Sequence, residues 1–479
     1  MRWLSATLAL VCGVTLGLRV AAGDASDLRE RLADALCHED LLDVQIGAAV
    51  IDLEDGRLLF GHNANRLFNP ASVTKVVTVA SALEILRPEY RFPTIFRSEN
   101  EIDDDGTLKG NLYIEGRGDP SLVSERFFKI ARTLREIGLR KVKGRLVIDE
   151  SYFDREQENV GWDCDDSSSA YRARAGAFSL NFNAVRLMIR PAPKQGQPAV
   201  VEVSPPTRYV QVRNKLLTNR RRSWYKATSV GDGNRTLVEL KGHVHHGAPP
   251  RAIHVRIMDP ARYAGTVMAE FLNREGIKIR RVPLIRPTPP AADRVLWVER
   301  SRSLGSLVRL LSKHSNNFQS EQLLKVLGAQ SAGPPAAWDD GVDAVAGFLE
   351  RLGIRRGSYR LQNGSGLGEA NLFTPRQIVT VVRWAASQPE IGPEFLSAMP
   401  VAAADGTIRW RMADSEADRV LRAKTGSLES VSALAGVVLG QGKRHGRAFA
   451  IFMNGELRGR IRRMWKFQDA FAKVVAGGL

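Results

Sequence analysis

Cysteine is scarce in this chain, whose 479 residues include three: Cys12, Cys37 and Cys164. Zinc and redox sites that use cysteine need closely spaced pairs, and no two of these residues are close in sequence. The sequence therefore indicates no cysteine-based metal or redox site. Cys37 and Cys164 fit no disulfide framework, and whether they pair in an oxidising compartment stays open.

The N-terminal apolar run is too short for a membrane span. It extends from Leu4 to Leu18, whereas a helix needs about 20 apolar residues to cross a bilayer. Arg2 precedes the run and small residues up to Gly23 follow it, which is typical of a secretory signal peptide over residues 1–23. We therefore expect an exported protein that is periplasmic and either soluble or loosely attached to a membrane.

Acidic residues are outnumbered, with 52 Asp and Glu against 69 Lys and Arg, so the net charge is +17. Removal of Arg2 and Arg19 with the signal peptide would leave +15. Such a charge favours contact with an acidic wall polymer or with anionic membrane headgroups. The basic run at residues 220–222 is isolated and no nucleic-acid motif accompanies it, so we expect no nucleic-acid partner. The sequence does not indicate an oligomeric state.

Hydrophobic patterning predicts an α+β protein with several domains. Helices are expected at residues 27–41, 76–86, 304–311, 318–327 and 457–475. Strands are expected at residues 46–53, 57–60, 111–115, 144–148, 185–189, 200–203, 209–212, 237–240, 254–258, 421–428, 433–439 and 448–453. We expect residues 97–298 to be a mostly β insertion, in two subdomains, within a discontinuous domain of residues 27–96 and 299–479. Prolines between residues 283 and 290 suggest a linker at the end of the insertion.

Ser72 and Lys75 form a candidate nucleophile and base. They lie three residues apart at the start of a predicted helix, so both side chains project from one face. A serine hydroxyl needs a neighbour that removes its proton, and a lysine among apolar residues has a lowered pKa that suits this task. Pro70 places Ser72 in the first helical turn, where unpaired N–H groups favour developing negative charge. This spacing also arises often by chance, so further motifs are needed to assign a catalytic role to the pair.

A second motif, Ser315-Asn316-Asn317, lies between two of the predicted helices. Ser315 can relay the proton from Lys75 toward a leaving amine. Asn317 offers an amide that can hold Lys75 and a peptide group of the substrate. These are functions that a serine acyl-transfer site needs in addition to its nucleophile and base.

A third motif, Lys424-Thr425-Gly426-Ser427, lies on the predicted strand at residues 421–428. Lys424 supplies a positive charge and Thr425 a hydroxyl, which together suit the terminal carboxylate of a substrate. We expect the oxyanion of the tetrahedral intermediate to lie between the backbone N–H groups of Ser72 and Ser427, since such donors lower a barrier by about 3 to 4 kcal/mol. A side chain at Gly426 would crowd a substrate along the strand edge.

The three motifs, in this order, resemble those of penicillin-binding proteins and their β-lactamase relatives. Four more segments resemble boxes of the low-molecular-mass class C penicillin-binding proteins, the D-alanyl-D-alanine carboxypeptidase and endopeptidase family. They are Gly116-Arg117-Gly118-Asp119-Pro120, Ser179-Leu180-Asn181-Phe182-Asn183-Ala184-Val185, Asn363-Gly364-Ser365-Gly366-Leu367 and Asp405-Gly406-Thr407. The 243-residue separation of Ser72 from Ser315 is similar to that of a family with inserted domains and exceeds that of a compact β-lactamase. Asn363 and Glu369 depart from the family pattern, which has an acid and often an arginine there.

The resemblance implies a penicillin-binding fold, in which helices flank an antiparallel sheet, and a serine DD-peptidase without metal or cofactor. Such an enzyme hydrolyses D-alanyl-D-alanine bonds of peptidoglycan stem peptides, as a carboxypeptidase or an endopeptidase, and β-lactam antibiotics acylate its serine. The catalytic residues would be Ser72, Lys75 and Ser315, with Asn317 and residues 424–427 binding the substrate. The alternatives are a serine β-lactamase, which would need a base for deacylation, and a non-catalytic cell-wall-binding or penicillin-sensing protein.

Overall fold

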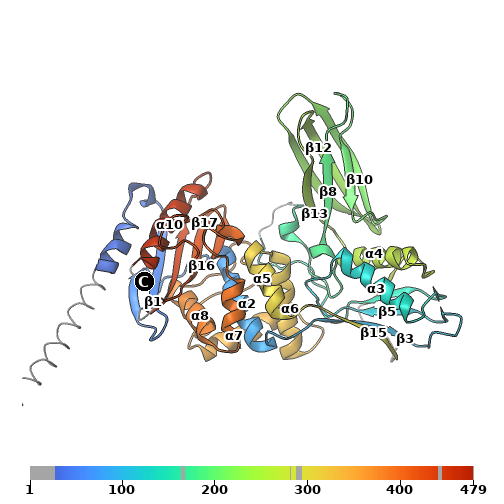
Figure 1. The fold of residues 1–479 in the computed structure, drawn as a ribbon, viewed down its shortest axis with the longest axis horizontal. Helices are drawn as coiled ribbons and strands as arrows, with labels where there is room; N and C mark the ends of the chain where they lie inside the picture. Colours follow the sequence, from blue (N-terminus) through green and yellow to red (C-terminus); the bar gives the residue numbers. More distant parts are fainter. Residues whose placement is uncertain (1–26, 163–167, 281, 287–293, 441–444, 478–479) are drawn as a thin grey trace, which may run out of the picture.

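The computed structural model describes residues 27–162, 168–280, 282–286, 294–440 and 445–477 (Figure 1). The expected signal peptide and Cys164 lie outside these residues, so the signal peptide stays a prediction and the pairing of Cys164 stays open. Cys37 is exposed. Within the described ranges, no helix is both long and apolar enough to cross a membrane.

A five-stranded sheet in the order β16-β17-β18-β1-β2 lies on the left in Figure 1. Its strands are β1 (Gln45–Asp52), β2 (Leu58–His62), β16 (Leu421–Leu428), β17 (Val431–Val438) and β18 (Arg447–Asn454). All neighbouring strands are antiparallel, and β1 pairs with β18 from Gln45 opposite Asn454 to Asp52 opposite Arg447. The predicted N-terminal hairpin is confirmed, and it completes a sheet whose other strands come from the end of the chain.

Different helices cover the two faces of this sheet. Successive side chains of a strand point to opposite faces, so Ala49 and Val50 belong to separate cores. Ala49 faces α2 (Thr74–Leu86) and α8 (Pro375–Ser387), whereas Val50 faces α10 (Ile461–Ala476). The sheet therefore lies between two layers of helices.

The predicted helix at residues 27–41 is shorter in the structure. Residues 27–34 are helical, and a separate 3₁₀ turn, η1 (Glu39–Leu41), follows. The side chain of His38 accepts a hydrogen bond from the N–H of Asp40 at 3.1 Å. This cap begins a new turn and so separates the two segments.

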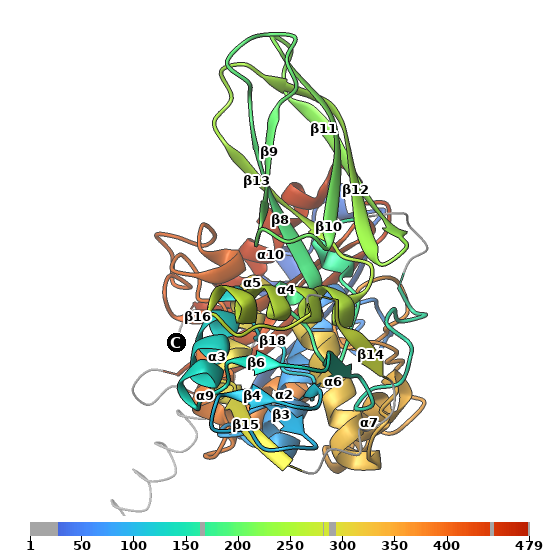
Figure 2. The same cartoon turned by 90° about the vertical axis from the view of Figure 1, so that its right-hand side faces the viewer.

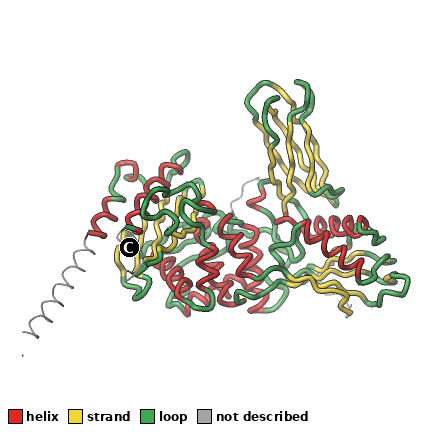
Figure 3. The backbone as a smooth tube through the Cα atoms, in the orientation of Figure 1, coloured by secondary structure: helices red, strands yellow, loops and turns green. Residues whose placement is uncertain are grey.

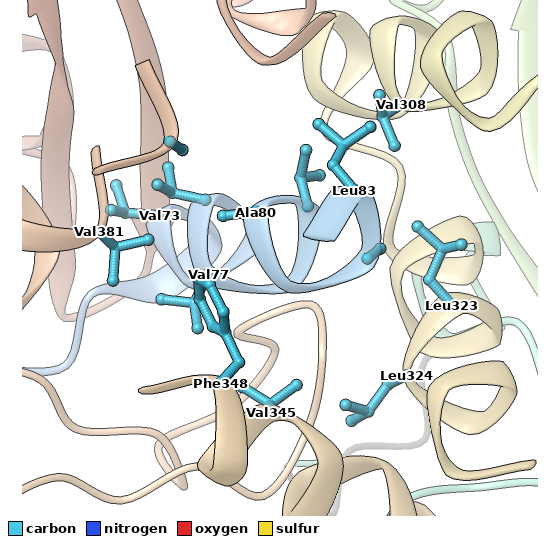
Figure 4. Close-up of a cluster of buried hydrophobic side chains, with 14 of the residues drawn as sticks. Val73, Val77, Ala80, Leu83, Val308, Leu323, Leu324, Val345, Phe348 and Val381 are labelled. Atoms are coloured by element: carbon cyan, nitrogen blue, oxygen red, sulfur yellow. The ribbon is translucent and has the colours of Figure 1, made fainter. Parts of the chain in front are cut away.

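Helix α2 is buried on nearly every side and lies at the centre of the helical layer. It is surrounded by α5 (Leu304–His314), α6 (Asn317–Ala332), α7 (Trp338–Arg351), α8 and α9 (Gly392–Ala398). Figure 4 shows Val77, Ala80 and Leu83 of α2 among apolar side chains of these helices. A helix that is apolar around its whole circumference is typical of such a position, and Lys75 is buried with it. The sequence predicts α5 and α6, but not α7, α8 and α9.

A second five-stranded sheet, in the order β14-β7-β5-β3-β15, lies largely within residues 97–298, which the sequence predicts to be an insertion. Its strands are β3 (Pro93–Ser98), β5 (Leu112–Glu115), β7 (Leu146–Asp149), β14 (Leu284–Arg286) and β15 (Arg294–Arg300), and a small pair, β4 (Thr107–Leu108) with β6 (Lys141–Val142), lies nearby. Helices α3 (Ser124–Glu136) and α4 (Pro260–Arg274) share a core with this sheet. The sequence does not predict these two helices, although Asp259 caps α4 and Pro260 opens it, both common helix-start signals.

Two details of this sheet bear on the predicted domain limits. Strand β14 lies in the proline-containing stretch expected to be a linker, and it pairs with β7 instead. Strands β3 and β15 pair with each other and run across the predicted limits at residues 96 and 298. The division of the chain into domains stays a prediction.

Residues 184–256 form what we call the arm, two three-stranded sheets that project from the rest of the molecule (Figures 1 and 2). One sheet contains β8 (Ala184–Arg190), β9 (Val200–Ser204) and β13 (Arg251–Arg256), and the other β10 (Val210–Asn219), β11 (Trp224–Asp232) and β12 (Arg235–His245). Figure 3 shows that the arm consists of strands and loops. The sequence predicts all of these strands except β11. Leu187, Leu216 and Leu240 of the arm belong to the same core as α3 and α4.

Candidate active site

Ser72 lies in a single 3₁₀ turn, η2 (Ala71–Val73), directly before α2. The side chain of Asn69 accepts a hydrogen bond from the N–H of Ala71 at 2.8 Å, and Ala71 has a φ of 46°. A left-handed conformation at a residue other than glycine is strained and persists where its surroundings hold it. Ser72 is therefore placed before the helix by a constrained turn, close to the predicted first helical turn.

The amine of Lys75 has three hydrogen-bond acceptors. Its Nζ donates to Ser72 Oγ at 2.8 Å, to Asn317 Oδ1 at 2.7 Å and to the carbonyl oxygen of Ser365 at 2.6 Å. The side chain is completely buried. Burial lowers the pKa of Lys75 well below its ordinary value, the charge of Lys424 lowers this pKa further, and Glu321 opposes both effects. A neutral amine at this distance can take the proton of Ser72.

A second lysine approaches the second motif. Lys424 Nζ, on β16, donates to Ser315 Oγ at 2.7 Å and to the carbonyl oxygen of Thr425 at 2.6 Å. Burial lowers the pKa of Lys424 to about 7. Ser315 ends α5 in the left-handed conformation, with a φ of 56°, which turns the chain between α5 and α6. The structure thus brings the second and third motifs together, as the sequence predicts.

Asn316 and Asn317 have different structural tasks. The side chain of Asn316 caps α6 by accepting from the N–H of Gln319 at 3.0 Å. The amide of Asn317 donates through Nδ2 to the carbonyl oxygen of Tyr171 at 3.0 Å. Tyr171 belongs to the predicted insertion, and none of the sequence motifs contains it. Because its backbone carbonyl makes the contact, the residue type carries no signal of this role.

The third motif runs along β16 beside the turn that holds Ser72. Thr425 Oγ1 donates to Thr407 Oγ1 at 2.8 Å, which joins the Asp405-Gly406-Thr407 box to the site. Lys313 Nζ donates to the carboxylate of Asp405 at 2.7 Å and holds that box in place. Part of the expected site therefore depends on a loop far from it in sequence.

Packing gives a reason for Gly426 in addition to the expected room for substrate. A Cβ at this position would clash with the carbonyl oxygen of Pro70 and would lie 3.1 Å from the Cβ of Ala433. Only a residue without a side chain lets β16 approach the Ser72 turn this closely. The predicted reason for the glycine was incomplete because the sequence does not reveal where Pro70 lies.

A cleft of about 400 Å³ opens at Ser72. Its lining includes Tyr171, Asn317, Leu367, Ser427 and Glu429. The two residues whose N–H groups are expected to form the oxyanion hole, Ser72 and Ser427, thus line one cleft. Lys75 and Lys424 lie beneath the surface and reach the cleft through the groups that they contact.

Glu321 is a buried carboxylate that lies outside the sequence motifs. It accepts from the N–H of Gly364 at 3.2 Å, from the N–H of Ser365 at 3.0 Å and from the indole N–H of Trp338 at 2.9 Å. Since the carbonyl of Ser365 holds Lys75, Glu321 supports the base through one loop. The signal in the sequence was its spacing, because Glu321 follows Asn317 by four residues and lies on the same face of α6.

The box that contains Asn363 is part of this support. The Asn363 side chain donates to the carbonyl of Leu367 at 2.9 Å and accepts from the N–H of Gly366 at 2.8 Å. Thr78 of α2 donates to the carbonyl of Gly364 at 2.7 Å. The box therefore folds a tight loop behind Lys75, and the amide of Asn363 fulfils this task without the acid of the family pattern. Within the described residues, no group of three or more His, Cys, Asp or Glu side chains is arranged to hold a metal ion.

Comparison with known proteins agrees with this geometry. The sequence profile of the D-Ala-D-Ala carboxypeptidase 3 (S13) family matches residues 28–472. The chain belongs to this family. A D-alanyl-D-alanine carboxypeptidase of Actinomadura sp. (strain R39) is 30% identical over 470 residues, which cover 94% of this chain and 86% of that protein. The resemblance to the D-alanyl-D-alanine carboxypeptidase family inferred from the motifs is confirmed, and the chain is a serine-type D-Ala-D-Ala carboxypeptidase, a hydrolase.

Two further relatives come from Haemophilus influenzae. The D-alanyl-D-alanine carboxypeptidase DacB is 26% identical over 438 residues, which cover 90% of this chain and 88% of that protein. The crystal structure of penicillin binding protein 4 (dacB) superposes with a TM-score of 0.80 at 24% identity, covering 94% of this chain and 97% of that one. The expected α+β penicillin-binding fold of this S13 chain is confirmed.

Proposed function

We propose that this chain hydrolyses D-alanyl-D-alanine bonds of peptidoglycan stem peptides through an acyl-enzyme on Ser72. One observation carries the proposal: the buried amine of Lys75 lies 2.8 Å from Ser72 Oγ, and burial lowers its pKa well below the ordinary value. A lysine in this state can act as a base near neutral pH. As a carboxypeptidase the enzyme releases a terminal D-alanine, and as an endopeptidase it cuts D-alanyl cross-links through the same acyl-enzyme.

Acylation begins with proton transfer from Ser72. A neutral lysine amine has two N–H groups and one lone pair. Asn317 and the carbonyl of Ser365 accept from the N–H groups, which directs the lone pair at the hydroxyl of Ser72. Ser72 then attacks the carbonyl carbon, and the backbone N–H groups of Ser72 and Ser427 stabilise the oxyanion.

Release of the leaving amine requires a proton. Ser315 relays the proton that Lys75 took from Ser72, and its hydroxyl accepts a hydrogen bond from Lys424 at 2.7 Å. The charge of Lys424 and the hydroxyl of Thr425 bind the terminal carboxylate, and a bound carboxylate in turn favours the charged form of Lys424. Water then hydrolyses the acyl-enzyme and releases the shortened peptide.

We propose that β-lactams acylate the same serine. The penicillin binding protein 4 of H. influenzae has been solved in complex with a β-lactam, and that structure superposes with a TM-score of 0.75. Labelled penicillin separates this reading from a β-lactamase, since label retained on Ser72 for many minutes supports a DD-peptidase and rapid turnover overturns it. Ser72→Ala should abolish both labelling and D-alanine release. A chain that acts only as a wall-binding or penicillin-sensing protein would keep its wall binding in this variant and would release no D-alanine even as wild type.

We also propose the context in which the enzyme works. The chain is exported to the periplasm, where peptidoglycan stem peptides and β-lactams reach it. There it contacts an anionic wall or membrane surface. The peptidase domain comprises residues 27–96 and 299–479, and residues 97–298 are inserted into it.

Mass analysis of the products from a monomeric and a cross-linked muropeptide measures the carboxypeptidase and endopeptidase activities separately. Fractionation of cells after expression of the full chain tests export.

A further inference from the structure

Positive charge is concentrated in the arm. Residues 184–256 contain 14 Lys and Arg against 3 Asp and Glu, a net charge of +11 out of +17 for the whole chain. The arm therefore carries about two thirds of the net charge in 73 of 479 residues. Figures 1 and 2 show that it projects away from the two five-stranded sheets, so this charge lies on a separate part of the molecule.

The outer face of the sheet β10-β12-β11 carries much of this charge. The strand register places Lys215 opposite Lys241, and Lys241 opposite Lys226, so three lysines form one row across the sheet. The side chains of Lys215 and Lys241 are 53% and 62% exposed. The other face of the same sheet is buried in the core through residues such as Leu216 and Leu240. The lysine row therefore faces outward.

One acid lies among these cations. Glu239 accepts from Lys215 at 2.9 Å and lies 3.0 Å from Lys241, and these contacts lower its pKa to about 2. Arg213, next to Glu239 in the register, adds another cation to the face. Like charges placed directly opposite each other on neighbouring strands are destabilising, and one carboxylate does not compensate for the row. The stability of the fold does not account for this face.

Beyond the lysine row, the face ends in a cationic loop. The loop between β10 and β11 contains Arg220, Arg221 and Arg222, and all three are exposed. Leu217 and Trp224, 48% and 61% exposed, are the large apolar side chains at this end. A helix or sheet that anchors in a bilayer presents a broad apolar stripe to the acyl chains, and two side chains do not form one. The composition of the face suits a polymer with repeated negative charges instead.

We propose that the arm is a docking surface for the free carboxylates of polymeric peptidoglycan. The proposal rests on the function proposed above, since the polymer on the arm is the one whose peptides the active site cuts. The strands of the face are nine to eleven residues long, up to about 36 Å, which is long enough to contact several carboxylates at once. Several weak ionic contacts to one polymer add up through multivalency.

The base of the arm lies directly beside the cleft. Ser169 pairs with Val255 of β13, and the N–H of Arg256 donates to the carbonyl of Ser168 at 2.9 Å. Two residues further along this segment, the carbonyl of Tyr171 holds Asn317 in the active site. A polymer bound to the arm is therefore kept close to Ser72, which raises the local concentration of stem peptides at the cleft.

Two charge-matched variants of the full chain test the proposal. The arm variant combines Arg220→Gln, Arg221→Gln, Arg222→Gln and Lys226→Gln, all exposed positions. The control variant combines Lys129→Gln, Arg355→Gln, Arg462→Gln and Lys466→Gln, which are exposed positions outside the arm. Both variants lose four positive charges, so net charge alone cannot distinguish them.

Binding is measured by co-sedimentation with insoluble peptidoglycan over a range of salt concentrations. We expect the wild type and the control variant to bind at low salt and to be released as salt rises. We expect the arm variant to bind at least about tenfold more weakly, and we expect methyl-esterified peptidoglycan to bind none of the three. Equal losses in both variants would overturn the proposal, and so would wild-type binding to phosphatidylglycerol vesicles without binding to peptidoglycan.

Hydrolysis of a small soluble D-Ala-D-Ala peptide separates this proposal from the proposed function. The arm variant should cleave the soluble peptide like the wild type and should release D-alanine from insoluble peptidoglycan more slowly. A wild type that binds peptidoglycan but cleaves no soluble peptide would overturn the proposed function and leave the docking surface in place. An arm variant that degrades insoluble peptidoglycan at the wild-type rate would overturn the docking surface alone.

Discussion

The side-chain amide of Asn317 donates to the main-chain carbonyl of Tyr171 at 3.0 Å, while its oxygen accepts from Lys75 at 2.7 Å. A carboxamide has one donor end and one acceptor end, so the Tyr171 carbonyl determines which end Lys75 meets. Tyr171, which lies in the predicted insertion, thereby orients a group of the active site. Removing the donor end of Asn317 should consequently disturb the base.

Asn317→Asp removes this donor and places a carboxylate between Lys75 and a carbonyl oxygen. The added negative charge raises the pKa of Lys75, so a higher pH is needed to produce the neutral amine. We expect the acid limb of penicillin acylation to move upward by about one pH unit and the rate at neutral pH to fall by up to about tenfold. Acylation rates measured over a range of pH check both effects.

Asn316→Asp is the matched control for this variant. It introduces the same charge one residue away, and Asp is as good a helix cap as Asn, so α6 should remain stable. We expect a smaller displacement of the acid limb than in Asn317→Asp. Equal displacements in the two variants would show that the orientation of Asn317 does not matter.

Lys424 should produce a basic limb in the hydrolysis of peptides. Its pKa is about 7, so it is charged below this pH and becomes neutral as the pH rises through it. A terminal carboxylate needs the charged form, and kcat/KM for a D-Ala-D-Ala peptide should therefore fall above about pH 7. The same peptide with an amidated C-terminus is the control and should lack this limb. A basic limb with both peptides would mean that a group other than Lys424 titrates.

Glu321→Gln should move the acid limb in the opposite direction to Asn317→Asp. The negative charge of Glu321 raises the pKa of Lys75, so its removal lowers that pKa and the amine becomes neutral at lower pH. The amide also presents a donor to the N–H groups of Gly364 and Ser365, and we expect a loss of about 1 to 3 kcal/mol in the free energy of unfolding. The pH dependence of acylation and denaturant unfolding measure the two effects.

An exposed glutamate provides the comparison for Glu321. Glu136→Gln, on α3, removes the same charge from a side chain that is 63% exposed and should leave both measurements nearly unchanged. An upward movement of the acid limb in Glu321→Gln would contradict the electrostatic argument. Loss of stability without any movement would mean that Glu321 supports the loop and does not influence Lys75.

The sequence could predict the site residues that stand in recognisable motifs, and it missed a backbone group and a carboxylate whose contacts depend on the fold. Ser72, Lys75 and Lys424 stand in motifs whose spacing follows from helix and strand geometry, and the strands around them lie where apolar runs predict them. Tyr171 acts through its carbonyl, which every residue has, so no sequence pattern points to it. Glu321 had a helical spacing from Asn317, but its importance depends on where the Ser365 loop lies in space.

The sequence predicted some helices better than others. It predicted apolar neighbours for Lys75 because α2 is apolar around its circumference. Helix α3 mixes charged and apolar residues and lies in a region where short strands were predicted, so its 3.6-residue period was not recognised. In the structure Phe127, Ile130 and Leu134 form a buried stripe along this helix. Tertiary packing against the sheet makes this stripe a core face, which local reading of the chain does not reveal.

Gly426→Ala tests the packing explanation for the glycine of the third motif. A methyl group there would clash with the carbonyl of Pro70, so β16 must shift away from the Ser72 turn. We expect a loss of about 1 to 3 kcal/mol in the free energy of unfolding and at least tenfold slower acylation by penicillin, because the N–H of Ser427 moves with the strand. Gly347→Ala is the control, since α7 leaves open space at that position and alanine should stabilise the helix by up to about 1 kcal/mol. If Gly426→Ala keeps full stability and normal penicillin acylation but raises KM for peptides, the methyl group crowds the substrate after all, and the packing explanation fails.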